Sequence, residues 1–360
     1  MIKNSFLILL FLSISFGSFS SEVTDSVATN ASTSAKGKFH VDKMIFDHIL
    51  DAYEWHITTI GKTHISIPLP VILYSKQSGF HCFMYSKFHH GERMVGNFKI
   101  AKEKPYEGKI VEIINGKEVR PYDLSITKNV VAILFSMLLV LWIFISTAKR
   151  YKTKPDTAPK GLQSFIEPII LFVRDDIAKS SIGEKRYEKF TPYLLSIFFF
   201  IWINNMLGII PIFPGGANIT GNITVTMLLA IFTFIITTFS GNKHYWKEIF
   251  NNPVAPWWLK LPIPLMPIVE FTGIFTKPFI LMIRLFANMS AGHIVALGFY
   301  SLIFIFGNMN LGAGYGISIV SIIFTVFMAL LELLVAFIQA YVFTLLSALY
   351  FGMAQPEEAH

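Results

Sequence analysis

Long apolar stretches separated by short polar or basic segments fill the chain after residue 128. The first stretch is 130–146. No charged residue occurs between positions 190 and 242, and the run Pro214-Gly215-Gly216 divides that region into two spans, about 191–212 and 223–240. Each stretch is close to the length that crosses about 30 Å of hydrocarbon as a helix. The pattern therefore predicts three membrane helices here.

The last two apolar stretches are longer, at about 268–305 and 315–352. Each would form a helix of roughly 57 Å, which is nearly twice the hydrocarbon thickness. Their ends carry few charges, so strong tilt is expected rather than projection into water. A glycine-rich turn at 307–314 makes the pair a hairpin, and prolines 262, 264 and 267 discourage a straight helix before Glu270. The predicted fold class is an all-α polytopic membrane protein of five helices, the last two a long tilted hairpin.

The first 127 residues have a different character. Residues 1–20 resemble a secretory signal peptide, although an uncleaved anchor would look similar. Residues 21–37 are rich in Ser, Thr and Ala, and this composition predicts disorder. Residues 38–127 hold short alternating runs, and Asn115-Gly116 between two of them indicates a β-hairpin. We predict a small, partly β extracytoplasmic domain.

Composition supports a membrane location. The 360 residues are 53% hydrophobic and 15% charged, whereas soluble domains have about 25% charged residues. The net charge of +7 has a local source: the segment 148–190 holds ten Lys or Arg against six Asp or Glu, which predicts a cytoplasmic loop. The charge therefore does not indicate a nucleic-acid partner.

Two features of the polar segments leave alternatives open. Within the basic loop, apolar residues 162, 165, 166, 169 and 173 share one helical face, as expected for a helix lying on the membrane surface or docking on a partner. Seven histidines lie between positions 40 and 90, but their spacing matches no metal-ligand pattern, so surface or packing roles are favoured. Cys82 is the one cysteine, which excludes an intrachain disulfide. We predict no metal or cofactor site.

Three ionisable residues stand out in the hairpin. From position 278 to 356 the formally charged residues are Arg284 and Glu332, with His293 as a third ionisable group. An arginine at bilayer depth costs from about 2.5 to over 10 kcal/mol, so it needs a partner or a water path. Arg284 and Asn288 share a helical face, as do Glu332 and Gln339. An antiparallel hairpin can bring Gln339 near Arg284 and His293 near Glu332; these groups could also simply lock the helices together.

These residues carry a family resemblance. The segments Arg284-Leu-Phe-Ala-Asn288-Met-Ser-Ala-Gly292-His293 and Glu332-Leu-Leu-Val-Ala-Phe-Ile-Gln339 resemble subunit a of the F-type ATP synthase. Gly161-Leu-Gln and Asn222-Ile-Thr-Val-Thr resemble the same family. The likeness covers about 130–353, and the segment before it resembles the extended front end of bacteroidete members. It implies domains at 1–20 (signal), 21–127 (extracytoplasmic), 128–353 (membrane domain) and 354–360 (cytoplasmic tail).

The resemblance implies a proton-channel subunit of the stator, without catalytic activity of its own, in the cell inner membrane. Its partners would be a ring of c subunits bearing buried carboxylates, b-type peripheral stalk subunits, the soluble ATPase sector and membrane lipid. Arg284 would face the ring between two half-channels. Polar positions matching the family are Glu270, Asn288, His293, Glu332 and Gln339, with His293 and Glu332 exchanged relative to many proteobacterial members. The resemblance also implies that Gly208 replaces a carboxylate that some members carry in the second span.

Two other functions fit the composition. A secondary transporter could use Arg284 to bind an anionic substrate, but it should show repeated halves with broken helices, and no internal repeat is visible. A receptor or scaffold acting through its soluble domain would leave Arg284, His293 and Glu332 unexplained.

Overall fold

The protein was analysed as a computed structural model of all 360 residues. The structure describes residues 50–60, 63–91, 93–101, 103, 105–153, 158–210, 215–250, 265–309 and 311–355. The predicted signal peptide and the Ser/Thr/Ala-rich segment lie outside these residues. The chain divides into an N-terminal unit, running to Phe135 and including Ile210–Ala217, and a helical unit formed by most of the rest. Each unit is described by itself.

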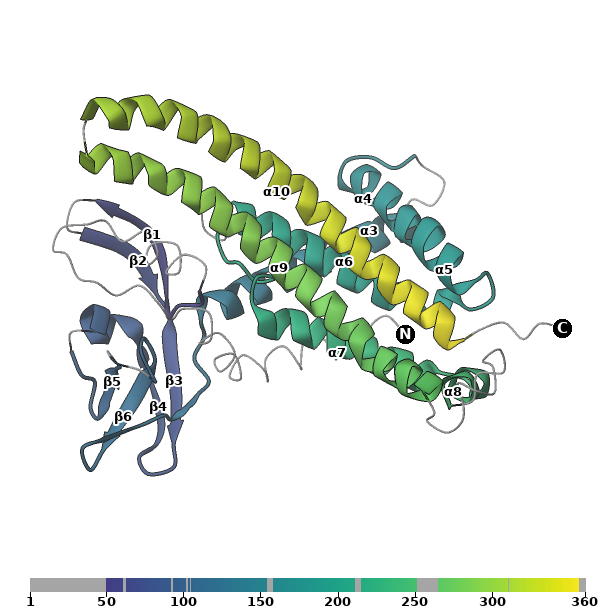
Figure 1. Cartoon of the computed structure of the whole chain (residues 1–360), viewed down its shortest axis with the longest axis horizontal. Helices are drawn as coiled ribbons and strands as arrows, with labels where there is room; N and C mark the ends of the chain where they lie inside the picture. Colours follow the sequence, from purple (N-terminus) through teal and green to yellow (C-terminus); the bar gives the residue numbers. More distant parts are fainter. Residues whose placement is uncertain are drawn as a thin grey trace. The chain divides into compact units, whose positions relative to one another are not determined.

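Antiparallel strands form the described part of the N-terminal unit (Figure 1). The first sheet pairs β1 (Glu54–Ile60) with β2 (Thr63–Pro68). In the second sheet the strand order is β4 (Gly79–Met84), β3 (Pro70–Ser75), β8 (Tyr122–Asp123), and η2 (Tyr85–Gly91) is a 3₁₀ segment that follows β4. In the third sheet the order is β5 (Phe98–Ile100), β6 (Ile110–Ile114), β7 (Lys117–Val119). The prediction of a partly β domain is confirmed.

The predicted hairpin at Asn115-Gly116 is also confirmed. Ile114 pairs with Lys117, so the two turn residues connect β6 directly to β7. Asn115 has φ 50° and Gly116 has φ 77°. Two successive positive φ angles are the geometry of a type I′ turn, which Asn-Gly adopts more easily than other dipeptides. The turn chemistry therefore sets the register of this hairpin.

The two larger sheets contribute to one small core. Its buried apolar side chains are Val71, Leu73, Phe88, Phe98 and Ile110. Glu112 is buried among them, and its carboxylate accepts hydrogen bonds from the hydroxyls of Ser75 and Ser78. These bonds offset the cost of burying a polar group.

Hydrogen bonds fix the start of helix α3 (Lys128–Thr153) to this unit. The Asp51 carboxylate accepts from the backbone N–H groups of Ala52 and Asn129, each at 3.0 Å. Burial raises the pKa of Asp51, although both backbone bonds favour its charged form. The Ile126 N–H also donates to the Pro70 carbonyl at 3.1 Å. The first turn of α3 is thus hydrogen-bonded to the segment just before β1, and the residues leading into α3 are hydrogen-bonded to β3.

Five described helices have the length and composition to cross a membrane, as predicted. They are α3, α6 (Tyr187–Ile209), α7 (Ile223–Ser240), α9 (Leu265–Met309) and α10 (Leu311–Ala354). Asn222 caps α7 by accepting a hydrogen bond from the Thr224 N–H at 3.0 Å. The chain is therefore a multi-pass membrane protein, and its short helix α8 (Lys243–Phe250) follows α7.

The amphipathic segment of the basic loop packs on the chain's own helices. It forms α4 (Leu162–Leu171), a π-helical segment η3 (Phe172–Lys179) and α5 (Ser180–Ile182). Ile166 and Val173 of the predicted face join the main core, whereas Phe165 is 61% exposed and stacks on Trp202 at 6.3 Å. The wider π-helical turn shifts the following side chains, so Ile177 and Ala178 continue the buried face.

The last two helices form the predicted hairpin and lie side by side along their lengths (Figure 1). With 45 and 44 residues they are even longer than predicted, each roughly 67 Å. The expectation of no straight helix before Glu270 was wrong, because α9 begins at Leu265 and includes Pro267. Proline is tolerated in a first turn, where its missing N–H has no helical partner anyway. Pro278 lies inside α9 as well.

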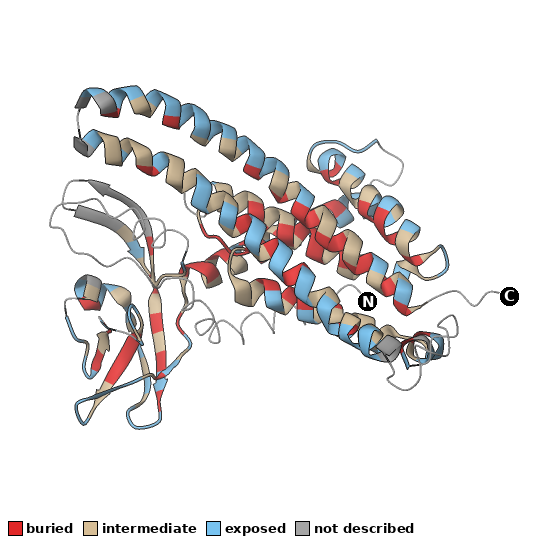
Figure 2. Cartoon of the chain, in the orientation of Figure 1, coloured by how far each residue is buried: buried red, intermediate tan, exposed pale blue. Residues whose placement is uncertain are grey.

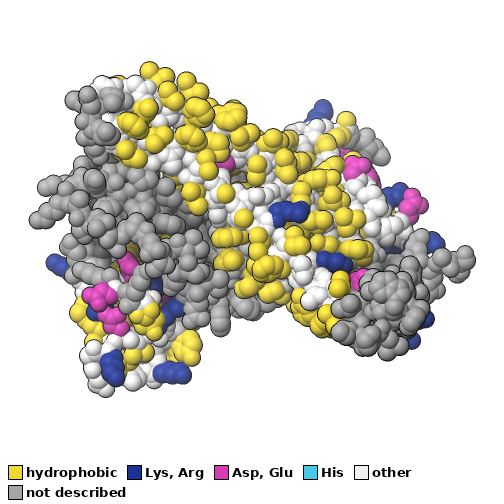
Figure 3. All heavy atoms as spheres, viewed as in Figure 1, with side chains coloured by type: hydrophobic (Ala, Val, Ile, Leu, Met, Phe, Trp, Pro, Cys, Tyr) yellow, Lys and Arg dark blue, Asp and Glu magenta, His cyan; other side chains and the backbone are white. Residues whose placement is uncertain are grey.

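Burial differs between the two ends of α10 (Figure 2). Toward its C-terminus Ala340, Phe343, Ala348 and Phe351 are buried in the main core with residues of α6 and α7, and Ala336 is buried as well. Toward its start most side chains are exposed, among them Ile319, Ile323 and Leu330. Figure 3 shows hydrophobic side chains covering much of the visible face of the hairpin, with isolated basic groups among them. Such a surface suits lipid or another membrane subunit.

Candidate functional site

Close approach of glycines sets the register of the hairpin. A Cβ atom added to Gly314 would lie 2.8 Å from the Gly307 Cα, and one added to Gly292 would lie 2.9 Å from Glu332 Oε1. At Gly314 the backbones of the two helices meet directly, and at Gly292 the absent side chain makes room for the side chain of Glu332. We call this line of contact the seam: Gly292, His293 and Gly307 on α9, with Gly314 and Glu332 on α10.

The predicted neighbours His293 and Glu332 meet in the seam. His293 Nδ1 lies 3.4 Å from Glu332 Oε1, and the two side chains are 13% and 9% exposed. The contact has ion-pair distance but not hydrogen-bond alignment, so Glu332 Oε1 and His293 Nε2 are both buried without a hydrogen-bond partner. Buried polar atoms in this condition are costly unless water or a proton completes them. Within the described chain, Glu332 Oε1 and His293 Nε2 therefore still lack a hydrogen-bond partner.

Arg284 has a different environment. It lies on the outer face of α9, which we define by the exposed residues Ile280, Ile283, Arg284, Ala287, Asn288 and Ala291. Within the described part of the chain, no hydrogen bond or ion pair holds its guanidinium. Tyr350 is near enough to feel its charge. Because Ala287 and Ala291 are small, the backbone of another helix could approach the arginine closely.

Gln339 is buried and lies level with Arg284. The register that places Glu332 beside Gly292 brings residues seven or eight positions further along α10 opposite Arg284. Gln339 is 6% exposed, so it faces the interior of the hairpin and bundle rather than the outer face. The described contacts include no hydrogen bond between the two side chains. Gln339 and Arg284 therefore lie at the same height along the hairpin but are not hydrogen-bonded to each other.

Glu270 stands apart from the other predicted residues. It precedes Arg284 by 14 positions, or about 21 Å along α9. Its side chain is half-buried. The pKa of the Tyr245 phenol on α8 is raised, mainly by burial and in addition by the negative charge of Glu270. Ionisable groups therefore lie on both sides of Arg284 along the helix, with His293 about 14 Å away in the other direction.

The sequence patterns missed a buried amide that connects three segments. Asn205 on α6 accepts a hydrogen bond from Thr220 Oγ1 at 2.5 Å and donates to the Ala336 carbonyl at 3.2 Å. Asn204 Oδ1 and Asn218 Nδ2 are buried nearby in sequence without hydrogen-bond partners. The sequence feature that could have revealed this connection is the pair of adjacent asparagines, Asn204 and Asn205, inside an otherwise apolar span. Asn205 fixes α6 and the turn before α7 against α10, at the residue one turn from Glu332.

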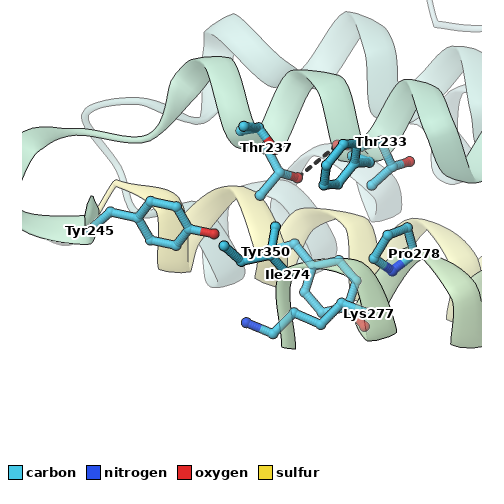
Figure 4. A pocket seen from close by; sticks show the side chains of 9 residues that line it. Thr233, Thr237, Tyr245, Ile274, Lys277, Pro278 and Tyr350 are labelled. Atoms are coloured by element: carbon cyan, nitrogen blue, oxygen red, sulfur yellow. Dashed lines mark hydrogen bonds between the residues drawn. The ribbon is translucent and has the colours of Figure 1, made fainter. Parts of the chain in front are cut away.

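A small pocket lies where α7, α8, α9 and α10 meet (Figure 4). It measures about 260 Å³, including its open mouth. Lys277 and Tyr350 line it, with the Lys277 ammonium 5.8 Å from the centre of the Tyr350 ring, and Tyr245 points in from α8. Thr237 donates to the Thr233 carbonyl at 2.7 Å across its upper wall. The pocket thus places a lysine and two phenols at the Glu270 end of α9.

Residues suited to metal binding do not gather in the described chain: no three His, Cys, Asp or Glu residues lie close enough to share an ion. Cys82 is a free, exposed thiol. Of the candidate histidines, His40 and His48 lie outside the described residues.

Comparison with known proteins identifies the family. Residues 130–352 match the model of the ATP synthase A chain, and residues 44–124 match a domain of unknown function. The chain is 45% identical over 245 residues to ATP synthase subunit a of Chloroherpeton thalassium, covering 68% of this chain and 70% of the relative. It is 42% identical over 287 residues to ATP synthase subunit a 2 of Chlorobaculum tepidum, with 74% and 77% covered. ATP synthase subunit a of Myxococcus xanthus is 44% identical over 238 residues, with 64% and 73% covered. The chain belongs to the ATP synthase A chain family.

Proposed function

We propose that this chain is the proton-channel subunit of the stator in an F-type ATP synthase, with Arg284 facing a ring of carboxylate-bearing c subunits. The observation that carries the proposal is the position of Arg284. It is exposed on the outer face of α9 beside small residues, and no described carboxylate pairs with it. A permanent cation at membrane depth needs an anionic partner, and none is provided within the described chain.

The chemistry of arginine suits this role. The guanidinium keeps its proton in proteins, so Arg284 cannot relay protons and instead blocks a direct leak past the ring. Its charge also favours the ionised form of a carboxylate that comes near, which releases that carboxylate's proton. The available drive is about 2.3 kcal/mol per charge for each 100 mV of membrane potential. A leak past Arg284 would dissipate that modest drive, so a fixed barrier is required.

The separation of ionisable groups along α9 supports two half-channels. His293 and Glu332 lie on one side of Arg284, and Glu270 with the Lys277–Tyr350 pocket lies on the other. Neither group is near enough to pass a proton directly to the other. A proton would therefore have to travel between them on the ring. Asn288 and Gln339, at or near the level of Arg284, would help to position the guanidinium or the ring carboxylate.

We further propose the orientation and the partners. The excess of Lys and Arg in the loop 148–190 supports an orientation with the N-terminal unit in the periplasm and the C-terminus in the cytoplasm of the inner membrane. The immediate neighbours would be the c ring, b-type stalk subunits and lipid, with the soluble ATPase sector reached through the complex. The chain would carry no catalytic centre or cofactor of its own.

Co-purification tests the function against its rivals. A mild detergent extract, captured through a tag on this chain, should contain a small ring subunit and soluble ATPase subunits in fixed ratio. Capture of the chain alone, with transport of an organic anion into proteoliposomes, would support a secondary transporter instead. The helices argue against a secondary transporter, because α9 and α10 are continuous through 265–309 and 311–354 rather than broken at a substrate site.

Labelling a cysteine at position 358 tests the orientation. In intact cells carrying the Cys82→Ser background, a membrane-impermeant thiol reagent should not reach position 358, because Cys82 is itself an exposed thiol. Labelling from outside would reverse the proposed topology.

A further inference from the structure

The sheet β4–β3–β8 of the N-terminal unit has one buried face and one exposed face. Val71 and Leu73 of β3 are fully buried in the small core, and the residues that alternate with them point the other way. On that second face Tyr74 pairs directly with Phe80 of β4, which lies beside β3 (Figure 1), and with Tyr122 of β8. Because directly paired residues of neighbouring strands point to the same side of a sheet, the three aromatic side chains lie together.

The exposed face continues as an apolar surface along the three strands. Cys82 and Met84 follow Phe80 at alternate positions of β4, and Leu124 comes two residues after Tyr122. The Leu124 N–H donates to a β3 carbonyl at 2.9 Å, so Leu124 stays beside the sheet. Cys82 is exposed, and the larger side chains are 42% to 65% exposed. We call this surface the aromatic face: Tyr74, Phe80, Cys82, Met84, Tyr122 and Leu124.

None of these six side chains is charged, but a cation lies at the border of the aromatic face. The Lys76 ammonium is 5.9 Å from the centre of the Tyr122 ring, and that ring is 6.3 Å from the ring of Tyr74. Asp123, next to Tyr122, points to the buried side, where its carboxylate accepts a hydrogen bond from the Tyr53 hydroxyl. Tyrosine and lysine are suited to a boundary between apolar material and water, since each has an apolar body and a polar tip.

The aromatic face ends close to the point where the first membrane helix begins. Helix α3 starts at Lys128, so extended chain of at most about 14 Å separates it from Leu124, and at most about 22 Å from Tyr122. The N-terminal unit itself includes α3 as far as Phe135. The Ile126 N–H donates to a β3 carbonyl at 3.1 Å, which keeps the connection on the sheet. The sheet is therefore attached to a membrane helix at its start and stays near the bilayer surface.

We propose that the aromatic face rests on the lipid leaflet at which α3 enters the membrane, with Lys76 beside the phosphate of an anionic lipid. The apolar side chains would reach the boundary between headgroups and acyl chains, where interfacial anchors bind. A contiguous exposed apolar surface marks either a membrane contact or a protein contact. Its continuity with the start of a membrane helix favours lipid. This inference concerns the N-terminal unit and does not rest on proton transport.

Photocrosslinking in native membranes tests the contact in the assembled protein. Phe80→p-benzoylphenylalanine and, separately, Tyr122→p-benzoylphenylalanine place a benzophenone in the aromatic face with little change in ring shape. Lys117→p-benzoylphenylalanine is the control, because Lys117 is exposed at the β6–β7 hairpin of another sheet. After photolysis and digestion, mass spectrometry should find phospholipid adducts several-fold more often at positions 80 and 122 than at position 117.

Two results would overturn the lipid contact. Protein adducts in place of lipid at positions 80 and 122 would make the aromatic face a docking surface for another subunit. Lipid adducts no more frequent there than at position 117 would mean that the face does not reach the bilayer.

Lipid charge tests the role of Lys76. The purified complex carrying Tyr122→p-benzoylphenylalanine is reconstituted into liposomes of phosphatidylcholine and phosphatidylglycerol in equal amounts. Adducts should favour the anionic phosphatidylglycerol by about threefold, because a lysine near a membrane surface attracts anionic headgroups. Adding Lys76→Gln should remove this preference, and Lys117→Gln should leave it unchanged. Equal yields from the two lipids before that change, or a preference that survives Lys76→Gln, would overturn the assignment of Lys76.

Discussion

The seam and the outer face of α9 differ in the burial and pairing of their ionisable side chains. In the seam, His293 and Glu332 are nearly buried and meet at 3.4 Å within one chain. On the outer face Arg284 is exposed, at a level where α10 offers only the buried Gln339. A self-contained membrane protein would pair its arginine with its glutamate. Here the register of the hairpin separates Glu332 from Arg284 by about 12 Å along the helix, and the proposal that Arg284 meets a partner outside the chain rests on this separation.

The largest expected effect comes from the outer face. Arg284→Ala should reduce ATP-driven proton pumping in inverted vesicles at least about 100-fold, because it removes both the barrier to leakage and the pull on the ring carboxylate. The protein should still insert and keep its melting temperature, since no described bond depends on the guanidinium. Arg284→Lys should also fail largely, because lysine lacks the planar fork and loses its proton more easily.

Ile283→Ala is the matched control on the same face, where the side chain is 41% exposed. It should pump like the parent. Normal pumping by Arg284→Ala would defeat the assignment.

In the seam, the effects of substituting His293 and Glu332 should depend on each other. His293→Glu and Glu332→His each place two like groups together, and each should cost about tenfold in pumping, because like charges in one buried site disfavour ionisation. The double exchange restores one acid and one imidazole, so it should recover more activity than either single change. The measurement is a double-mutant cycle on pumping at equal abundance.

Strictly independent effects in that cycle would contradict a functional pair. A lowered melting temperature without loss of pumping would instead mean that the two side chains only lock the helices together.

A smaller effect should follow from adding one methyl group to the seam. Gly292→Ala places a Cβ 2.9 Å from Glu332 Oε1 and 3.3 Å from its Cγ, so the glutamate must move away from His293. Pumping should fall several-fold. Gly298→Ala is the matched control, because nothing lies within 4 Å of its added Cβ. Equal pumping by the two variants would mean that the exact position of Glu332 is unimportant.

The smallest effect on transport is expected for the amide between the helices. Asn205→Leu leaves the Thr220 hydroxyl without its acceptor and removes the second hydrogen bond to the Ala336 carbonyl, and should cost about 1–3 kcal/mol of stability. Pumping per folded molecule should change less than in the seam variants. Asn288→Ala, on the exposed outer face, should leave the thermal transition in detergent unchanged. A larger loss of stability in Asn288→Ala than in Asn205→Leu would reverse the contrast between buried and exposed groups.

Local patterns were sufficient to predict what depends on local geometry. The Asn115-Gly116 turn followed from backbone preference, and His293 met Glu332 because two long consecutive helices pack antiparallel, with close contacts at Gly292 and Gly314. The Asn205–Thr220–Ala336 connection joins three segments that are far apart in sequence, so no periodicity could reveal it. Phe165 lay on the predicted apolar face but is exposed beside Trp202, and the π-helical segment that follows it is not visible in a 3.6-residue pattern.

The central claim is that the outer face of α9 meets a carboxylate-bearing ring, and crosslinking tests it most directly. A benzophenone reagent attached to Ala287→Cys or Ala291→Cys in a Cys82→Ser background would be photolysed in native membranes, and the product identified by mass spectrometry. Phe239→Cys on α7, where the side chain is 87% exposed, serves as the control surface. The account predicts that both α9 positions crosslink to the small ring subunit and that position 239 does not. Crosslinking of the ring from position 239, with only lipid adducts at positions 287 and 291, would contradict it.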